Sequence, residues 1–253
     1  MTFLKMNTRK LLIILLLFTG FTARTQEKPP IGTDRPSQAP SASLIAPYTF
    51  QFESGVLYRT FESSRLTSFN SLWRFGVNEN FELRAFIDYV RLDRELDGGD
   101  GTESGWAPLQ LGTKIKISEQ YGWLPQASLV AMLALPSGQG SAEINRLIPD
   151  LRVTFANDVP GVLDIFYSLG VFWEPSTFKA IGLYTIGTGF TISDRVWSFV
   201  EFYGYFNDFA FGPSINGGFT WLAGNNIKID LTGGLDFPSD GGGFISSGIS
   251  FRL

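Results

Sequence analysis

The sequence predicts an all-β protein, a transmembrane antiparallel up-and-down β-barrel of about 12 strands. From Tyr48 onward, apolar and polar residues alternate in runs separated by turn-forming residues, which is the period of a strand whose two faces have different surroundings. Most runs have the roughly 9–11 residues that a tilted membrane strand needs, whereas soluble strands average about five or six. The connections alternate between short and long, as in outer-membrane barrels.

The N-terminal leader, residues 1–25, has the features of a secretory signal. Basic residues at 5–10 precede an apolar run at 11–21, and small residues stand at −3 and −1 of a cleavage site after Thr25. A transmembrane anchor is the alternative, but a spanning helix needs about 20 apolar residues. We therefore expect a cleaved signal peptide and an exported protein.

Composition excludes several classes of function. The chain contains no cysteine and no histidine, so disulfides, the Ser-His-Asp triad and most zinc sites are absent. Its net charge is −4, and removal of the leader, which holds four bases and no acid, changes this to −8. This charge argues against a nucleic-acid partner. We expect no enzyme, with a histidine-free active site as a minor alternative, and no cofactor or metal.

The segment 26–47, between the leader and the first strand, is polar and rich in proline. It contains "TDRPSQAP" at 33–40, where proline prevents both a helix and an extension of the first strand. We expect it to start on the periplasmic side and to fold back into the barrel mouth. Asp34 and Arg35 would then pair with charges in the lumen, as a plug or latch. The alternative is a disordered lead-in.

Residues 48–253 form the predicted barrel. The run 81–91 shows the pattern, with Phe81 and Leu83 on one face and Glu82 and Arg84 on the other. Turn-formers separate the runs. The expected strands span residues 48–59, 65–77, 81–91, 107–117, 124–135, 148–157, 162–173, 179–192, 197–206, 214–223, 227–237 and 244–253.

A soluble sandwich or lipocalin-like barrel would place the apolar face inward, whereas a membrane barrel places it outward against lipid. The membrane barrel is favoured because the long, hydrophilic connections 92–106 and 136–147 lie at the end opposite the short turns. The six tryptophans also stand near run ends, as interfacial girdles require. The last run, 244–253, is amphipathic and ends on an apolar residue, as suits a closing strand.

The polar face would line the lumen, and its bases and acids nearly balance. Such balance favours ion pairs and a narrow or occluded interior over a charge-selective ring; a purely structural role for the pairs is the alternative. Parity also turns Trp197, Phe199, Tyr203 and Tyr205 inward, either as a path for a small aromatic solute or through a parity error. The candidate lumen-lining residues are Glu53, Arg74, Glu82, Arg84, Asp88, Lys114, Lys116, Arg152, Asp164, Glu201, Lys228 and Asp230, and parity adds Arg59, Lys179, Asp236 and Arg252.

One stretch carries a family resemblance. "TDRP" at 33–36, followed by "YTFQFESGVLY" at 48–58, resembles the opening of a bacterial outer-membrane barrel family labelled "transporter" or "putative meta-pathway of phenol degradation". The family motif "FQ-E-G--Y" falls here on Phe50, Gln51, Glu53, Gly55 and Tyr58. The resemblance implies an outer-membrane protein for the uptake of small solutes, aromatic ones among them, and it brings no catalytic or binding residues.

We therefore expect a channel or transporter for small solutes in the outer membrane of a Gram-negative-type cell. The alternative is a structural or surface-interaction barrel that displays the connections 92–106 and 136–147 without transport. The expected partners are outer-membrane lipid, a small-molecule solute and the barrel-assembly machinery.

Overall fold

The computed structural model describes residues 29–95, 101–159, 163–207, 210–237 and 242–253. The predicted signal peptide, residues 1–25, lies outside this part of the chain. Among the residues described, no helix combines the length and the apolar character that a membrane span needs. The short 3₁₀ helix η1, Gly140–Ala142, lies in the connection that follows the strand β6, Gln126–Ala134.

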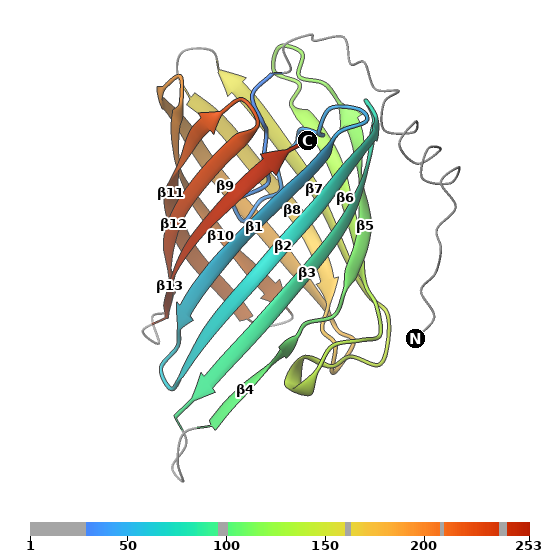
Figure 1. The fold of residues 1–253 in the computed structure, drawn as a ribbon, viewed down its shortest axis with the longest axis vertical. Helices are drawn as coiled ribbons and strands as arrows, with labels where there is room; N and C mark the ends of the chain where they lie inside the picture. The colour runs from blue at the N-terminus through green and yellow to red at the C-terminus, as the bar shows by residue number, and fades with distance from the viewer. Residues whose placement is uncertain (1–28, 96–100, 160–162, 208–209, 238–241) are drawn as a thin grey trace, which may run out of the picture.

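Antiparallel strands form one closed sheet (Figure 1). β1 pairs with both β2 and β13, so the first and last strands close the wall. β4 and β5 both pair with β3 and together occupy one position in the wall, which confirms a barrel of 12 strand positions. The strands are β1 Phe50–Thr60, β2 Ser64–Asn78, β3 Phe81–Arg94, β4 Gly101–Trp106, β5 Gln110–Ser118, β6 Gln126–Ala134, β7 Ile148–Val159, β8 Leu163–Trp173, β9 Ala180–Ser193, β10 Val196–Asn207, β11 Ala210–Gly224, β12 Ile227–Asp236 and β13 Gly243–Arg252.

The two faces of the wall are reversed relative to a soluble barrel. Large apolar side chains such as Leu83, Leu231 and Ile249 are exposed on the outside. Charged side chains such as Glu82 and Lys114, which alternate with apolar positions along the strands, are fully buried inside. Burying charge while exposing leucine and isoleucine is unfavourable in water, but it is favourable when the outer face contacts the hydrocarbon of a membrane. The prediction of an outward apolar face is confirmed.

The barrel has a turn end and a loop end. The chain enters β1 and leaves β13 at the turn end, where short turns join consecutive strands, such as residues 79–80 and 194–195. The loop end carries the longer connections, including the one that contains η1. This asymmetry agrees with the predicted alternation of connections. That the turn end faces the periplasm stays a prediction.

The predicted connection 92–106 is partly wrong as a loop. β3 continues to Arg94 and pairs with β4 in a hairpin that projects past the wall at the loop end (Figure 1). Arg94 and Glu103 form an ion pair of 2.8 Å across this hairpin. The stretch lacks apolar alternation because neither face of the hairpin packs on a core, so the sequence pattern did not show the strand.

The segment before β1 lies inside the barrel near the turn end, as the blue trace in Figure 1 shows. We call residues 29–47 the lead-in segment. Four of its apolar residues, Ile31, Ala39, Ala42 and Ile45, are buried within the wall of strands. They are four of the nine buried hydrophobic residues among those described, so the lead-in segment provides much of the core of an otherwise polar interior.

Candidate functional site

The lead-in segment crosses the lumen and contacts the wall on several sides. It starts at the turn between β11 and β12, where the Ile31 amide donates to the Asn225 carbonyl at 2.9 Å. It ends at β2, where the Tyr48 amide donates to the Gly76 carbonyl at 2.6 Å. Between these two anchors, its polar groups bond to side chains of β1, β3, β5, β7, β10 and β12, so it spans the interior instead of following one wall.

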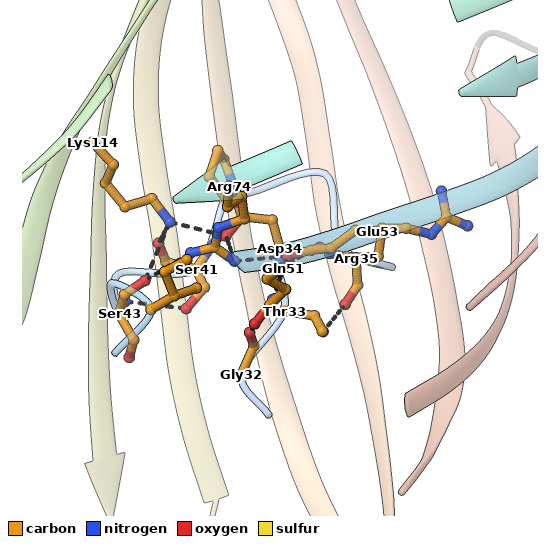
Figure 2. Close-up of polar contacts among 12 residues, drawn as sticks. Gly32, Thr33, Asp34, Arg35, Ser41, Ser43, Gln51, Glu53, Arg74 and Lys114 are labelled. Atoms are coloured by element: carbon orange, nitrogen blue, oxygen red, sulfur yellow. Dashed lines mark hydrogen bonds and ion pairs between the residues drawn. The ribbon is translucent and has the colours of Figure 1, made fainter. Parts of the chain in front are cut away.

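Asp34 lies at the centre of the main cluster (Figure 2). Its carboxylate accepts from Lys114 Nζ at 2.9 Å and from the guanidinium of Arg84. Arg74 Nη1 lies 3.4 Å from the same carboxylate, and the Ser41 amide donates to it at 3.1 Å. Three wall cations on β2, β3 and β5 therefore converge on one carboxylate from the lead-in segment.

Two wall carboxylates complete the cluster. Glu53 on β1 accepts from Arg74 Nη1 at 2.7 Å and from the backbone amides of Asp34 and Arg35 at 2.8 and 3.0 Å. Glu82 on β3 accepts from Arg74 Nε at 2.7 Å and from the Ile45 amide at 3.0 Å. Both carboxylates thus bind the lead-in backbone as well as the wall cations, which ties both halves of the segment to the wall.

Arg35 binds the wall on either side of β1 and β13, at β12 and β2. Its guanidinium forms a bidentate pair with Asp230 on β12 at 3.0 and 3.2 Å and also donates to Asn70 at 3.2 Å. Gly55 of β1 and Gly248 of β13 are direct register partners beneath it. A Cβ at Gly55 would lie 2.4 Å from Arg35 Cζ, and one at Gly248 would lie 2.3 Å from Arg35 Nε. The side chain fits because neither strand has a Cβ there.

After Asp34 and Arg35, a third place where side chains hold the segment lies on β10. The carboxylate of Glu201, which is fully buried, accepts from Ser37 Oγ at 2.6 Å and from the Gln38 amide at 2.7 Å. On β7, the Thr154 hydroxyl donates to the Pro40 carbonyl. The segment is therefore fixed at three separated places around the wall, by Asp34, Arg35 and the Ser37–Gln38 turn.

The charges around Asp34 set its ionisation. Burial alone would raise the pKa of this carboxyl group, but the opposing fields of Arg74, Arg84 and Lys114 hold the pKa well below its usual range. Asp34 is therefore ionised at neutral pH, and its negative charge contributes to the attachment of the lead-in segment.

The sequence matches the family model described as "Putative MetA-pathway of phenol degradation" over residues 33–253. The chain belongs to this family. The match begins at the "TDRP" motif and covers the rest of the chain, so the predicted resemblance is confirmed.

Solved structures with the same fold include an outer membrane channel and a porin. The COG4313 outer membrane channel from Pseudomonas putida F1 is 12% identical, with a TM-score of 0.63 over 84% of this chain and 98% of that chain. The KdgM porin in complex with disordered oligogalacturonate is 10% identical, with a TM-score of 0.54 over 79% and 98% of the two chains. No protein with curated annotation matches the sequence. The family member described here therefore has the fold of outer-membrane channels and porins.

The sequence-predicted residues in this family member separate into three sets. Glu53, Arg74, Glu82, Arg84 and Lys114 lie together around Asp34, as described above. A second set reaches the lead-in segment elsewhere: Glu201, Asp230, Lys228 through Thr33 at 3.4 Å, and Arg152 through the Gln38 carbonyl at 3.5 Å. The third set bonds within the barrel itself: Asp88 accepts from Ser68, Asp164 accepts from Trp197, and Lys116 pairs with Glu119.

One parity assignment was wrong. Lys179 precedes β9 and lies in an exposed turn at the loop end, so it does not belong to the inward face. The inward assignment of Trp197 and Phe199 on β10 agrees with the structure. Trp197 donates to the inward Asp164, and Phe199 is buried. Parity fails at Lys179 because the strand begins one residue later than the pattern predicted.

Sequence reasoning missed several residues of the site. Ser37, Gln38 and Ser41 bind the wall, yet their types alone do not distinguish them from ordinary loop residues. Gly248 was not predicted, and Gly55 was named only as part of the family motif, with no role. A glycine on the inward face of a strand indicates close approach by another group, and this signal could have identified both positions.

The lead-in segment has a hollow on each side. The loop-side chamber, of about 380 Å³, is lined by Asp34 and Arg35 and by apolar wall residues including Leu57, Phe86 and Met132. The turn-side chamber, of about 420 Å³, is lined by the opposite side of the segment and by Phe166 and Trp197. A vestibule of about 710 Å³ at the loop end shares Gln38 and Arg152 with the loop-side chamber. Among the described residues, no group of three or more acidic side chains could hold a metal ion.

Proposed function

We propose that the protein is an outer-membrane channel for small solutes of apolar or aromatic character, and that the lead-in segment closes it. The observation that carries this proposal is the path of the segment, which is anchored to three places around the lumen with a chamber on either side. Opening would require release of these anchors while the barrel wall stays intact. The family membership and the fold shared with channels support the same function.

The lining of the loop-side chamber supports the solute class. Leu57, Leu72, Phe86, Met132 and Phe244 contribute apolar surface to it. The one wall pair that borders it outside the Asp34 cluster, Arg152 with Asp150, is neutral as a pair at 2.9 Å. Apolar walls with a few paired polar groups suit a small solute with an aromatic or aliphatic body.

The protein would reach the outer membrane by export. We propose that the signal peptide is removed after Thr25 and that the barrel-assembly machinery inserts the remaining chain into the outer membrane. N-terminal sequencing of the protein from the outer-membrane fraction tests this proposal, with Gln26 as the expected first residue. A mature chain that begins beyond Asp34 would contradict it, because the central anchor would be missing.

Recording of single channels in planar bilayers tests the closure. The full-length mature protein should give rare or small current steps, and a chain without residues 26–40 should give larger and more frequent ones. Both proteins should migrate as heat-modifiable folded barrels on gels, which is the control for folding. Liposome swelling with phenol and with a sugar of similar size then measures preference, and phenol should enter faster.

A surface-interaction barrel without transport is the second candidate. The observation that favours it is the dense bonding of the interior, which could serve stability alone. The same recordings separate the two functions: a shortened barrel that is folded but carries no current supports the structural role and contradicts the channel.

A further inference from the structure

The wall around Asp34 has an excess of positive charge. Arg74, Arg84 and Lys114 carry three positive charges, and the wall carboxylates of Glu53 and Glu82 carry two negative ones. The third negative charge comes from Asp34, which belongs to the lead-in segment. If the segment leaves, the wall groups of this cluster keep one uncompensated positive charge, while Asp230 on β12 loses its partner Arg35. A buried charge without a partner is strongly unfavourable, so the open channel would take up an anion here.

The carboxylate of Asp34 is held in the manner of a bound ligand. Arg84 donates to Oδ2, while Lys114 at 2.9 Å and the Ser41 amide at 3.1 Å donate to Oδ1. Arg74 approaches from β2 at 3.4 Å. A planar guanidinium and a nearby ammonium match a planar carboxylate better than a spherical halide, because each carboxylate oxygen has its own donor.

We propose that Arg74, Arg84 and Lys114 form a binding site for solute carboxylates in the open channel, and that Asp34 occupies this site in the closed channel. The proposal rests on the proposed function, because it takes the lead-in segment as the movable closure. A solute that carries a carboxylate competes with Asp34, and its binding favours the open state. Such a solute is therefore both cargo and opening signal.

The position of the site narrows the class of solute. Asp34 borders both chambers, and Arg84 borders the loop-side chamber together with Leu72 and Phe86. A carboxylate bound at Arg84 would place the rest of the molecule against this apolar wall. The chamber of about 380 Å³ has room for one aromatic ring. The site therefore fits small aromatic or aliphatic monocarboxylates, with benzoate as a suitable probe.

Calorimetric titration of the purified, full-length barrel in detergent tests the site directly. In Asp34→Ala the internal ligand is absent, so benzoate should bind at least tenfold more tightly than it binds the unsubstituted protein. Benzamide, which has the same shape without the charge, should show no such gain. The double variant Asp34→Ala/Arg84→Gln should lose the increase in benzoate affinity that Asp34→Ala shows.

A matched control uses Asp88, an acid of β3 that lies outside the cluster. Asp88 is on the same strand as Arg84 but accepts from Ser68 at 2.6 Å. Asp88→Ala should therefore bind benzoate no more tightly than the unsubstituted protein. Two results would overturn the proposed site: an equal increase in benzoate affinity in Asp34→Ala and Asp88→Ala, or an equal increase in affinity for benzoate and benzamide in Asp34→Ala.

Hydrogen–deuterium exchange of the unsubstituted protein provides a second test that needs no variant. Saturating benzoate should speed exchange in peptides that cover residues 31–47, including the Ser41 amide, and benzamide should not. Unchanged exchange at saturation would overturn the competition with Asp34. Neither experiment measures current, so a barrel that binds benzoate but stays silent in bilayers contradicts the channel, whereas a conducting barrel without benzoate binding contradicts only the site.

Discussion

At Asp34, one ionised side chain joins the lead-in segment to three wall cations, and the contribution of this contact depends on pH. The pKa of Asp34 is held well below 3.8, its unperturbed value, by Arg74, Arg84 and Lys114 against the opposing effect of burial. A carboxyl group whose pKa is lowered by folding adds stability above its unfolded pKa. That stability is lost as the pH falls through the folded pKa.

We therefore expect the channel to stay closed from neutral pH down to about pH 4 and to open only at more acidic pH. The carboxylates of Glu53 and Glu82 face the same cluster. Asp34→Asn separates the contributions, because it should conduct already at pH 7. Bilayer recordings across this pH range provide the measurement, and opening of the unsubstituted channel between pH 5 and 6 would contradict the role given to Asp34.

Glu53 binds the lead-in backbone directly, since it accepts from two consecutive lead-in amides as well as from Arg74. Glu53→Gln leaves Arg74 with less compensating charge in a buried place. We expect it to lower the free energy of unfolding by about 3 kcal/mol. Urea unfolding of the barrel in lipid vesicles measures the loss. The exposed Glu62, changed to glutamine, is the control and should stay within about 0.5 kcal/mol of the original.

At the scale of elements, β1 and β13 close the barrel and also form the floor on which Arg35 rests. The register places Gly55 opposite Gly248, so two strands lack a side chain at the same height. The nearest atoms to an added Cβ at either position belong to the end of the Arg35 side chain, which can move, and not to the backbone. A substitution here should therefore displace the anchor and leave the wall folded.

We predict that Gly55→Ala breaks the Arg35–Asp230 pair and raises the frequency of open channels several-fold. Gly224→Ala is the matched control, because an added Cβ there meets nothing within 4 Å. Bilayer recording gives the result, and heat-modifiable migration on gels verifies folding. If both variants conduct alike, the fit between Arg35 and the paired glycines does not hold the segment.

The elements differ in how well their sequences predict them. Strands such as β3 and β12 are predicted because lipid and lumen require opposite side chains at alternate positions. β4 is not, since both its faces are polar and its pairing depends on partners across the hairpin, such as Arg94 and Glu103. The path of the lead-in segment was only a hypothesis from Asp34 and Arg35, because their partners lie as far along the chain as Asp230, and no spacing rule links them.

At the scale of the whole molecule, the barrel has its apolar surface outside and its charges inside. Position along a strand then decides what a substitution does on the outer face. Leu231 lies near the middle of β12 and is about half exposed, whereas Ile227 begins the same strand at the turn end. A charge at mid-depth loses all contact with water, while one near the end can reach it.

We expect Leu231→Arg to lower the free energy of unfolding by about 2–4 kcal/mol, and Ile227→Arg by about 0–1 kcal/mol. The two variants carry the same added charge on the same strand, so each is the control for the other. Unfolding in lipid vesicles measures both. Equal losses would mean that the outer face of β12 does not cross hydrocarbon.

The fastening of the lead-in segment beside β1 has a quantitative consequence. Tyr48 and Thr49 pair with Gly76 of β2, so the end of the segment stays fixed even when Asp34 is released. Asp34 therefore remains on a short tether next to its three cations, at an effective concentration in the millimolar range or above. A free carboxylate in the medium has to match that local concentration before it displaces Asp34. The channel would therefore stay closed at trace concentrations of the solute and open only when the solute is abundant.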